Sequence, residues 1–99
     1  MSKERAFVLR LKPLATIVAN ASAGLALSSI GIGPVNAVKK VLAKSNVSLD
    51  NIDVIEVNEA FAALSIAVDR ELKFKHEKLN VNGGAIALSH PLERVGHVC

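Results

Sequence analysis

The chain has 99 residues, so it holds one domain at most and can bury only a modest core. Hydrophobic residues make up 51% and charged residues 21%, a balance that excludes an intrinsically disordered chain. The net charge of +3 comes from scattered lysines, and aromatic residues are only 3%. Because nucleic-acid binding favours a clustered basic stripe with stacking aromatic side chains, we expect no nucleic-acid partner.

The only cysteine among these residues, Cys99, cannot form an intrachain disulfide, and no Cys/His spacing indicates a metal site. We therefore expect a reducing compartment, the cytoplasm, and no bound metal. Residues 13–38 carry no charge and follow a basic start, and Ala19-Asn20-Ala21 resembles a signal-peptidase site. Pro13 opens this run and Glu4 interrupts the basic part, and the run contains too many Gly, Ser and Asn residues for a membrane span. We expect no membrane association, with a secreted or membrane-anchored small protein, processed near Ala21 or Ala23, as the alternative.

The first predicted elements are a helix and a strand. Residues 3–11 predict a short helix, with apolar positions among charges and Pro13 near its end. Residues 14–19 form an apolar run of strand length without alternation, which is typical of a strand buried on both faces of a parallel sheet. Residues 20–33 are rich in Ser and Gly and predict a long loop.

The next elements alternate in the same way. Gly33-Pro34 predicts a helix start, because proline suits the first helical position. Residues 52–57 predict a second buried strand, after which the period becomes helical from Asn58 to about Lys73. Residues 79–82 predict a third short strand. The alternation predicts an α/β fold with a mixed or parallel sheet and packed helices.

Asn58 lies where a predicted strand ends and a predicted helix begins. Asn is a favoured helix N-cap, and Glu59 at the first helical position would suit the helix dipole. Ligands also bind at this edge of open α/β sheets, so a binding role stays open. Later in the chain, His90 ends an apolar segment; a single histidine is usually structural, yet it could serve as a general base or an oxyanion donor.

Four motifs, taken together, resemble the thiolase family, acetyl-CoA acetyltransferases in particular. They are Lys12-Pro13-Leu14-Ala15-Thr16-Ile17, Gly31-Ile32-Gly33-Pro34-Val35, Asn58-Glu59-Ala60-Phe61 and Asn82-Gly83-Gly84-Ala85-Ile86-Ala87-Leu88-Ser89-His90-Pro91. The resemblance runs from about Ala6 to His90 and implies part of the C-terminal half of a five-layered α-β-α-β-α fold. It also implies a homo-oligomeric enzyme that condenses two acetyl-CoA molecules to acetoacetyl-CoA, or runs the reverse thiolysis, with coenzyme A thioesters as substrates and no separate cofactor.

The resemblance assigns roles to five residues. His90 corresponds to the histidine that activates the nucleophilic cysteine and helps hold a thioester oxygen. Asn58 corresponds to the asparagine that positions a water beside that histidine, which completes an oxyanion hole. Ala60 and Phe61 would lie near the acyl and pantetheine pocket. Ile30 stands where the family commonly has Met, an acyl-pocket residue.

Both catalytic cysteines of the family lie in segments that these 99 residues do not match. The nucleophile belongs to the N-terminal half, and the second cysteine belongs to a Gly-rich segment further on. The resemblance therefore predicts a fragment of an acetyl-CoA acetyltransferase without turnover of its own. A non-catalytic CoA-binding or subunit-complementing module is the alternative.

The last seven residues depart from the family. After His90-Pro91 the family reads roughly Leu-Gly-Ala-Ser-Gly-Ala-Arg-Val, whereas this chain reads Leu92-Glu93-Arg94-Val95-Gly96-His97-Val98-Cys99. Restoring one G before the codons GAG CGA GTG GGG CAC GTN TGY gives Gly-Ala-Ser-Gly-Ala-Arg and then Val, Leu or Met. We interpret residues 1–92 as a partial thiolase C-terminal domain and residues 93–99 as an out-of-frame tail, which sequencing of the DNA tests.

Overall fold

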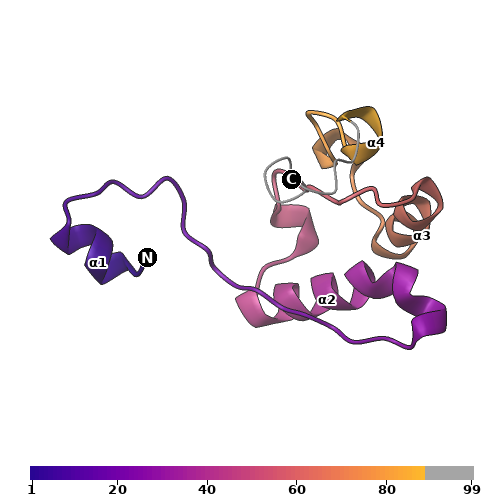
Figure 1. Cartoon of the computed structure of the whole chain (residues 1–99), viewed down its shortest axis with the longest axis horizontal. Coiled ribbons are helices and arrows are strands. Elements are labelled where there is room, and N and C mark those ends of the chain that lie inside the picture. Colours follow the sequence, from indigo (N-terminus) through magenta and orange to yellow (C-terminus); the bar gives the residue numbers. More distant parts are fainter. Residues whose placement is uncertain (89–99) are drawn as a thin grey trace.

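The computed structural model describes residues 1–88, and seven short helical elements are found there. The sequence interpretations of residues 89–99, including His90 and the out-of-frame tail, lie outside the described residues. In Figure 1 a first helix lies apart from the others, and a long connection leads from it to the rest of the chain. The fold therefore consists of an N-terminal arm (residues 1–26) and a helical body (residues 27–88).

The arm begins with α1 (Lys3–Val8), which confirms the predicted first helix in a shorter form. The Ser2 hydroxyl caps it by accepting a hydrogen bond from the Arg5 amide at 3.2 Å. Residues 11–26 then run without helix or strand. The radius of gyration is 15.6 Å, against about 13 Å for a compact domain of this length. The arm accounts for this excess, because it extends away from the body (Figure 1).

The predicted buried strand over residues 14–19 is wrong. Leu14, Ile17 and Val18 are 105%, 88% and 77% exposed, and the segment forms no ladder within the described residues. The physical reason is that a parallel strand needs neighbours for its backbone hydrogen bonds and layers for both faces. Residues 1–88 provide neither here. The chain just beyond is held instead by lysines of the next helix: Lys44 Nζ donates to the Asn20 carbonyl at 3.3 Å, and Lys40 Nζ to the Ser22 carbonyl at 3.1 Å.

The body opens with η1 (Leu27–Ile32), a 3-10 helix inside the predicted loop, and continues directly into α2 (Gly33–Ser45). The predicted helix start at Gly33-Pro34 is confirmed. Val35, in the first turn, is buried, because this face packs against α3. Asn46 ends α2 in the left-handed conformation with φ 55°, which Asn tolerates better than most residues.

The second long helix, α3 (Ala62–Leu72), begins four residues later than predicted. Its N-cap is Phe61, so residues 58–61 form a non-helical loop in front of it. The predicted end near Lys73 is confirmed: Lys73 has φ 54° and its amide donates to the Asp69 carbonyl at 2.6 Å.

The sheet predicted for this chain is reduced, within residues 1–88, to one parallel bridge between Ile55 and Leu79. The Ile55 amide donates to the Lys78 carbonyl, and the Asn80 amide donates to the Ile55 carbonyl, both at 2.8 Å. The third predicted strand is therefore a bridge followed by a turn. The remaining elements are η2 (Leu49–Asn51), η3 (His76–Lys78) and α4 (Ala85–Leu88).

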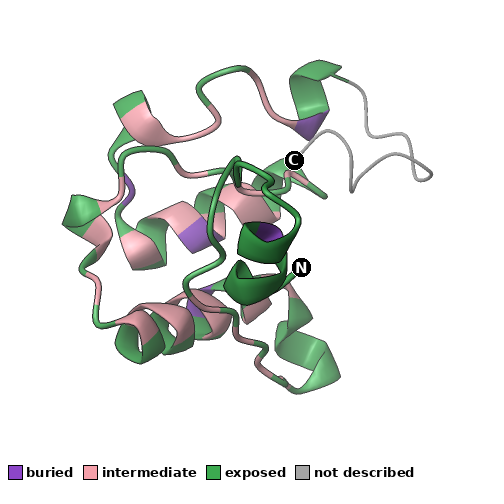
Figure 2. Cartoon of the chain, turned by 90° about the vertical axis from the view of Figure 1, so that its left-hand side faces the viewer, coloured by how far each residue is buried: buried purple, intermediate pink, exposed green. Residues whose placement is uncertain are grey.

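The hydrophobic core lies where α2 and α3 meet the bridged segments. Its buried members are Val35, Val68 and Phe74. Five partly buried residues pack around them: Leu49, Ile55, Val57, Leu72 and Leu79. Figure 2 shows how few positions are buried, and the arm, with α1 at its start, is almost wholly exposed. A core of this size leaves the bridged segments dependent on polar contacts as well.

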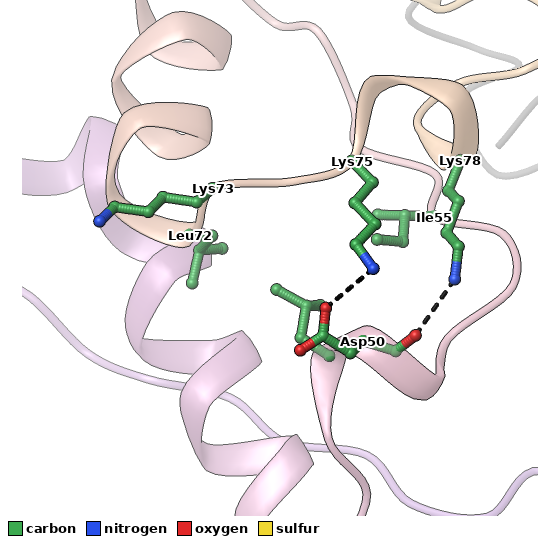
Figure 3. Close-up of a pocket in the computed structure, with 7 residues that line it drawn as sticks. Asp50, Ile55, Leu72, Lys73, Lys75 and Lys78 are labelled. Carbon is green, nitrogen blue, oxygen red and sulfur yellow. Dashed lines mark hydrogen bonds and ion pairs between the residues drawn. The ribbon is translucent and has the colours of Figure 1, made fainter.

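The side chain of Lys78 makes two of those polar contacts, and Figure 3 shows the one to Asp50. Its ammonium donates to the Asp50 carbonyl at 3.1 Å and to the Ile52 carbonyl at 2.6 Å, and the second bond is partly buried. Lys75 pairs with the Asp50 carboxylate at 3.1 Å, but both side chains are more than half exposed, so this ion pair contributes little. Lys78 therefore holds the chain before Ile55 against the chain before Leu79.

Replacing Lys78 tests that contribution. We expect Lys78→Met to lower the free energy of unfolding by about 1.5–3 kcal/mol, because two carbonyls lose a charged donor while the aliphatic stem is kept. Urea unfolding followed by circular dichroism measures it. Lys39→Met, at an exposed position of α2, is the matched control. Equal stability of the two variants would show that Lys78 does not hold the bridge.

Candidate functional site

The candidate site is a cavity of about 380 Å³ bounded by η1, the start of α2, α3 and the segment before α3. Three of the residues assigned by the sequence resemblance line it, namely Ile30, Asn58 and Ala60. The full lining is Ile30, Gly31, Pro34, Glu56, Val57, Asn58, Ala60, Leu64, Ser65 and Val68. The walls are mainly apolar with a few polar groups, as small-molecule sites usually are, and the volume falls in the range of such sites.

Asn58 lies in the non-helical loop in front of α3. The interpretation of this residue as the cap of that helix is wrong, because Phe61 occupies the cap position. The Asn58 side chain is exposed at the cavity and forms no hydrogen bond with the described residues 1–88. Its amide is therefore available to a ligand or a water in the cavity.

The three substrate-binding candidates have different places. Ile30 lies on η1, is 68% exposed and lines the cavity. Ala60 lies two residues after Asn58 and also lines it. Phe61 is 70% exposed and is not part of the lining. Its carbonyl accepts from the Ser65 hydroxyl at 3.3 Å, so its backbone anchors the first turn of α3.

His90, the second catalytic candidate, lies outside the described residues. The last described element, α4, ends at Leu88. The role of His90 stays a prediction from the resemblance.

The sequence interpretation missed the contact between Gly31 and Leu64, which both line the cavity. A Cβ placed on Gly31 would overlap the Leu64 side chain. Gly31 therefore lets η1 approach α3 closely, and Leu64 forms a wall beside Ile30. Gly31 belongs to one of the four motifs and Leu64 to a predicted helix, but nothing in the sequence indicated that the two would pair.

A second cavity of about 350 Å³ is bordered by Asp50, Ile55, Lys73, Lys75 and Lys78 (Figure 3). Two of its three lysines already bind protein oxygens, so it has the contacts of a structural junction rather than an anion site. Among residues 1–88, no group of three or more His, Cys, Asp and Glu side chains could hold a metal ion. In the same range, no helix is both long and apolar enough to cross a membrane.

Known proteins match this chain over nearly its whole length. The family model "Thiolase, C-terminal domain" matches residues 11–98. An acetyl-CoA acetyltransferase of Syntrophomonas wolfei is 53% identical over 98 residues, which is 97% of this chain and 25% of the relative. A probable acetyl-CoA acyltransferase of Staphylococcus epidermidis is 49% identical over 96 residues, again 97% of this chain and 24% of the relative.

Solved structures give the same result. The crystal structure of the Bacillus anthracis acetyl-CoA acetyltransferase matches with a TM-score of 0.88 at 47% identity, covering 92% of this chain and 23% of that protein. Human mitochondrial 3-ketoacyl-CoA thiolase matches with a TM-score of 0.87 at 47% identity, with the same coverage. The backbone is thus that of one part of an α/β enzyme class, the thiolases. The chain belongs to the thiolase family, as a portion of its C-terminal domain, and spans about a quarter of the length of these relatives.

The close approach at Gly31 is open to a test by substitution. We expect Gly31→Ala to lower the free energy of unfolding by about 1 kcal/mol, because the new methyl displaces the Leu64 side chain. In a Leu64→Ala background the same change should cost almost nothing, since the displaced atoms are gone. Urea unfolding of the four proteins measures both costs. An equal cost in both backgrounds would contradict this contact.

Proposed function

We propose that these residues form the thioester-binding side of the active site of an acetyl-CoA acetyltransferase. The reaction is the condensation of two acetyl-CoA molecules to acetoacetyl-CoA, or the reverse thiolysis. One observation carries the proposal: in a chain of the thiolase family, the side chain of Asn58 is exposed at a cavity that Ile30 and Ala60 also line. The relatives from S. wolfei and B. anthracis bear the name acetyl-CoA acetyltransferase.

Asn58 would act by stabilising negative charge. Removing a proton from the acetyl group of a thioester places charge on the thioester oxygen, and hydrogen-bond donors held in place lower the energy of that enolate. In this proposal Asn58 positions a water beside His90, and the water and the imidazole donate to the oxygen. The free state of the Asn58 amide supports this, because no contact within residues 1–88 has to be broken first.

The cavity walls would accept the acyl group. Ile30, Leu64 and Ala60 offer apolar surface, and the volume of about 380 Å³ suits a short acyl chain with part of its thioester. Phe61, exposed beside Ala60, would contact the pantetheine arm. The substrate would be a coenzyme A thioester, with no separate cofactor.

The nucleophile would come from thiolase sequence outside these 99 residues. Cys99 is the only cysteine here, and it belongs to the segment interpreted as an out-of-frame tail. We therefore expect the purified 99-residue chain to catalyse no thiolysis of acetoacetyl-CoA by coenzyme A. The assay follows the loss of the acetoacetyl-CoA absorbance. Measurable turnover of the pure chain would refute the proposal that the nucleophile comes from thiolase sequence outside these 99 residues.

A complementing module is the second candidate function. The observation in its favour is the exposed apolar arm with Leu14, Ile17 and Val18, surface that would be covered by docking onto a larger thiolase body. The parent enzyme is expected to be homo-oligomeric. Restored thiolysis on mixing the chain with a thiolase that lacks the matched quarter would support this role, and the absence of any complex in gel filtration would count against it.

The catalytic role of Asn58 is tested in a chimaera. The matched quarter of the B. anthracis enzyme is replaced by the corresponding residues of this chain. We expect thiolysis within roughly tenfold of the parent rate, a barrier difference of about 1.4 kcal/mol. Asn58→Ala should then lower kcat by roughly 100-fold or more, as loss of oxyanion stabilisation does.

Asn36→Ala, at an exposed position of α2, is the matched control and should leave kcat unchanged. An inactive chimaera that is folded would refute the proposed function. An active chimaera in which Asn58→Ala matches Asn36→Ala would refute the role of Asn58 alone.

A further inference from the structure

Both sequence neighbours of Asn58 are bound by one short segment, residues 80–86. On the N-terminal side, the Asn80 side chain binds both backbone groups of Val57. Its Oδ1 accepts from the Val57 amide at 2.8 Å, and its Nδ2 donates to the Val57 carbonyl at 3.0 Å. Asn80 directly follows Leu79 of the Ile55–Leu79 bridge. Its side-chain amide thus makes the two hydrogen bonds to Val57 that the backbone of a neighbouring strand would otherwise make.

On the C-terminal side of Asn58, the Glu59 carboxylate uses both of its oxygens. Oε1 accepts from Asn80 Nδ2 at 3.3 Å, and Oε2 accepts from the Ile86 amide at 2.9 Å. The Ile86 amide belongs to the first turn of α4 and has no partner within that helix. Glu59 was expected in the first turn of α3; it caps a different helix, 27 residues along the chain.

Gly84 gives this carboxylate its space. A Cβ built on Gly84 would overlap the Glu59 carboxylate, Oε2 first. The turn that brings Gly84 there contains two left-handed residues, Asn80 at φ 46° and Gly83 at φ 91°. Gly84 itself lies outside that left-handed range, so the position requires glycine for room rather than for conformation.

We propose that Glu59 is a positioning residue for Asn58. Together with Asn80 it fixes the backbone on either side of Asn58 against the start of α4, while the Asn58 side chain, exposed at the cavity, has no hydrogen bond with residues 1–88. Glu59 does not line the cavity, so it is not assigned contact with the substrate. Asn58 acting in catalysis rests on the proposed function; the clamp made by Glu59, Asn80 and Gly84 does not.

The clamp is tested first in the full 99-residue chain, by NMR measurement of amide hydrogen exchange at Ile86. We expect Glu59→Ala to speed this exchange by roughly tenfold or more, because the Ile86 amide loses its carboxylate acceptor. Glu71→Ala, the same change at an exposed site on α3, should leave it unchanged.

Gly84→Ala should speed the exchange in the wild-type background as well, because its methyl displaces the carboxylate. In a Glu59→Ala background it should have no further effect. Unchanged exchange at Ile86 in Glu59→Ala, or equal effects of Gly84→Ala in both backgrounds, would overturn the clamp.

The positioning role is tested in the chimaera. Glu59→Gln should lower kcat by roughly tenfold with KM changed less than twofold, since displacing a catalytic group by a fraction of an ångström is costly. In an Asn58→Ala background the same change should lower kcat no further. A purely structural effect would lower kcat in both backgrounds and would overturn the role. If the chimaera itself is inactive, the proposed function fails, and the exchange at Ile86 decides the clamp independently.

Discussion

The body of this chain depends on the side chain of Asn80. Its two hydrogen bonds to the Val57 backbone continue the single parallel bridge between Ile55 and Leu79. These contacts bring two segments together that are more than twenty residues apart in sequence. With them in place, Ile55 and Leu79 reach the core around Val68, and the following loop lies over the cavity. Asn80 adopts a left-handed conformation, which Asn tolerates better than most residues.

Helices were predictable here because their signals are local. Gly33-Pro34 marks the start of α2, and the helical period predicted after Asn58 ends near Lys73, where α3 ends. Strands were not predictable in the same way, because a strand forms only with neighbouring strands, and an apolar run in the sequence does not show which segments those are. Residues 14–19 have the composition of a buried strand and yet are exposed, and residues 52–57 contribute one bridge. The chain matches about a quarter of its relatives' length, so the α/β class follows from the likeness to thiolases and not from a sheet within residues 1–88.

The candidate site, like the fold, could be predicted from the sequence only in part. Motif resemblance selected Ile30, Asn58 and Ala60, and the structure brings them to one cavity although Ile30 comes from a different part of the sequence. Their chemical roles, and that of His90, remain predictions. The residues that support the site could not be predicted from the sequence. The contact of Gly31 with Leu64 and the hydrogen bonds of Glu59 to distant partners leave no local sequence pattern. The local pattern around Glu59 was misleading, because an acidic residue after Asn is typical of the start of a helix.

The central physical claim is that Asn80 and the Ile55–Leu79 bridge hold the loop of Asn58 in place. Amide hydrogen exchange across the unmodified 99-residue chain tests it most directly. We expect the amides of Ile55, Val57 and Asn80 to exchange at similar rates and at least roughly tenfold more slowly than those of residues 14–18, because each has a hydrogen-bond acceptor in the folded body. Exchange of the Val57 amide as fast as residues 14–18, while the amides of α2 stay protected, would contradict it.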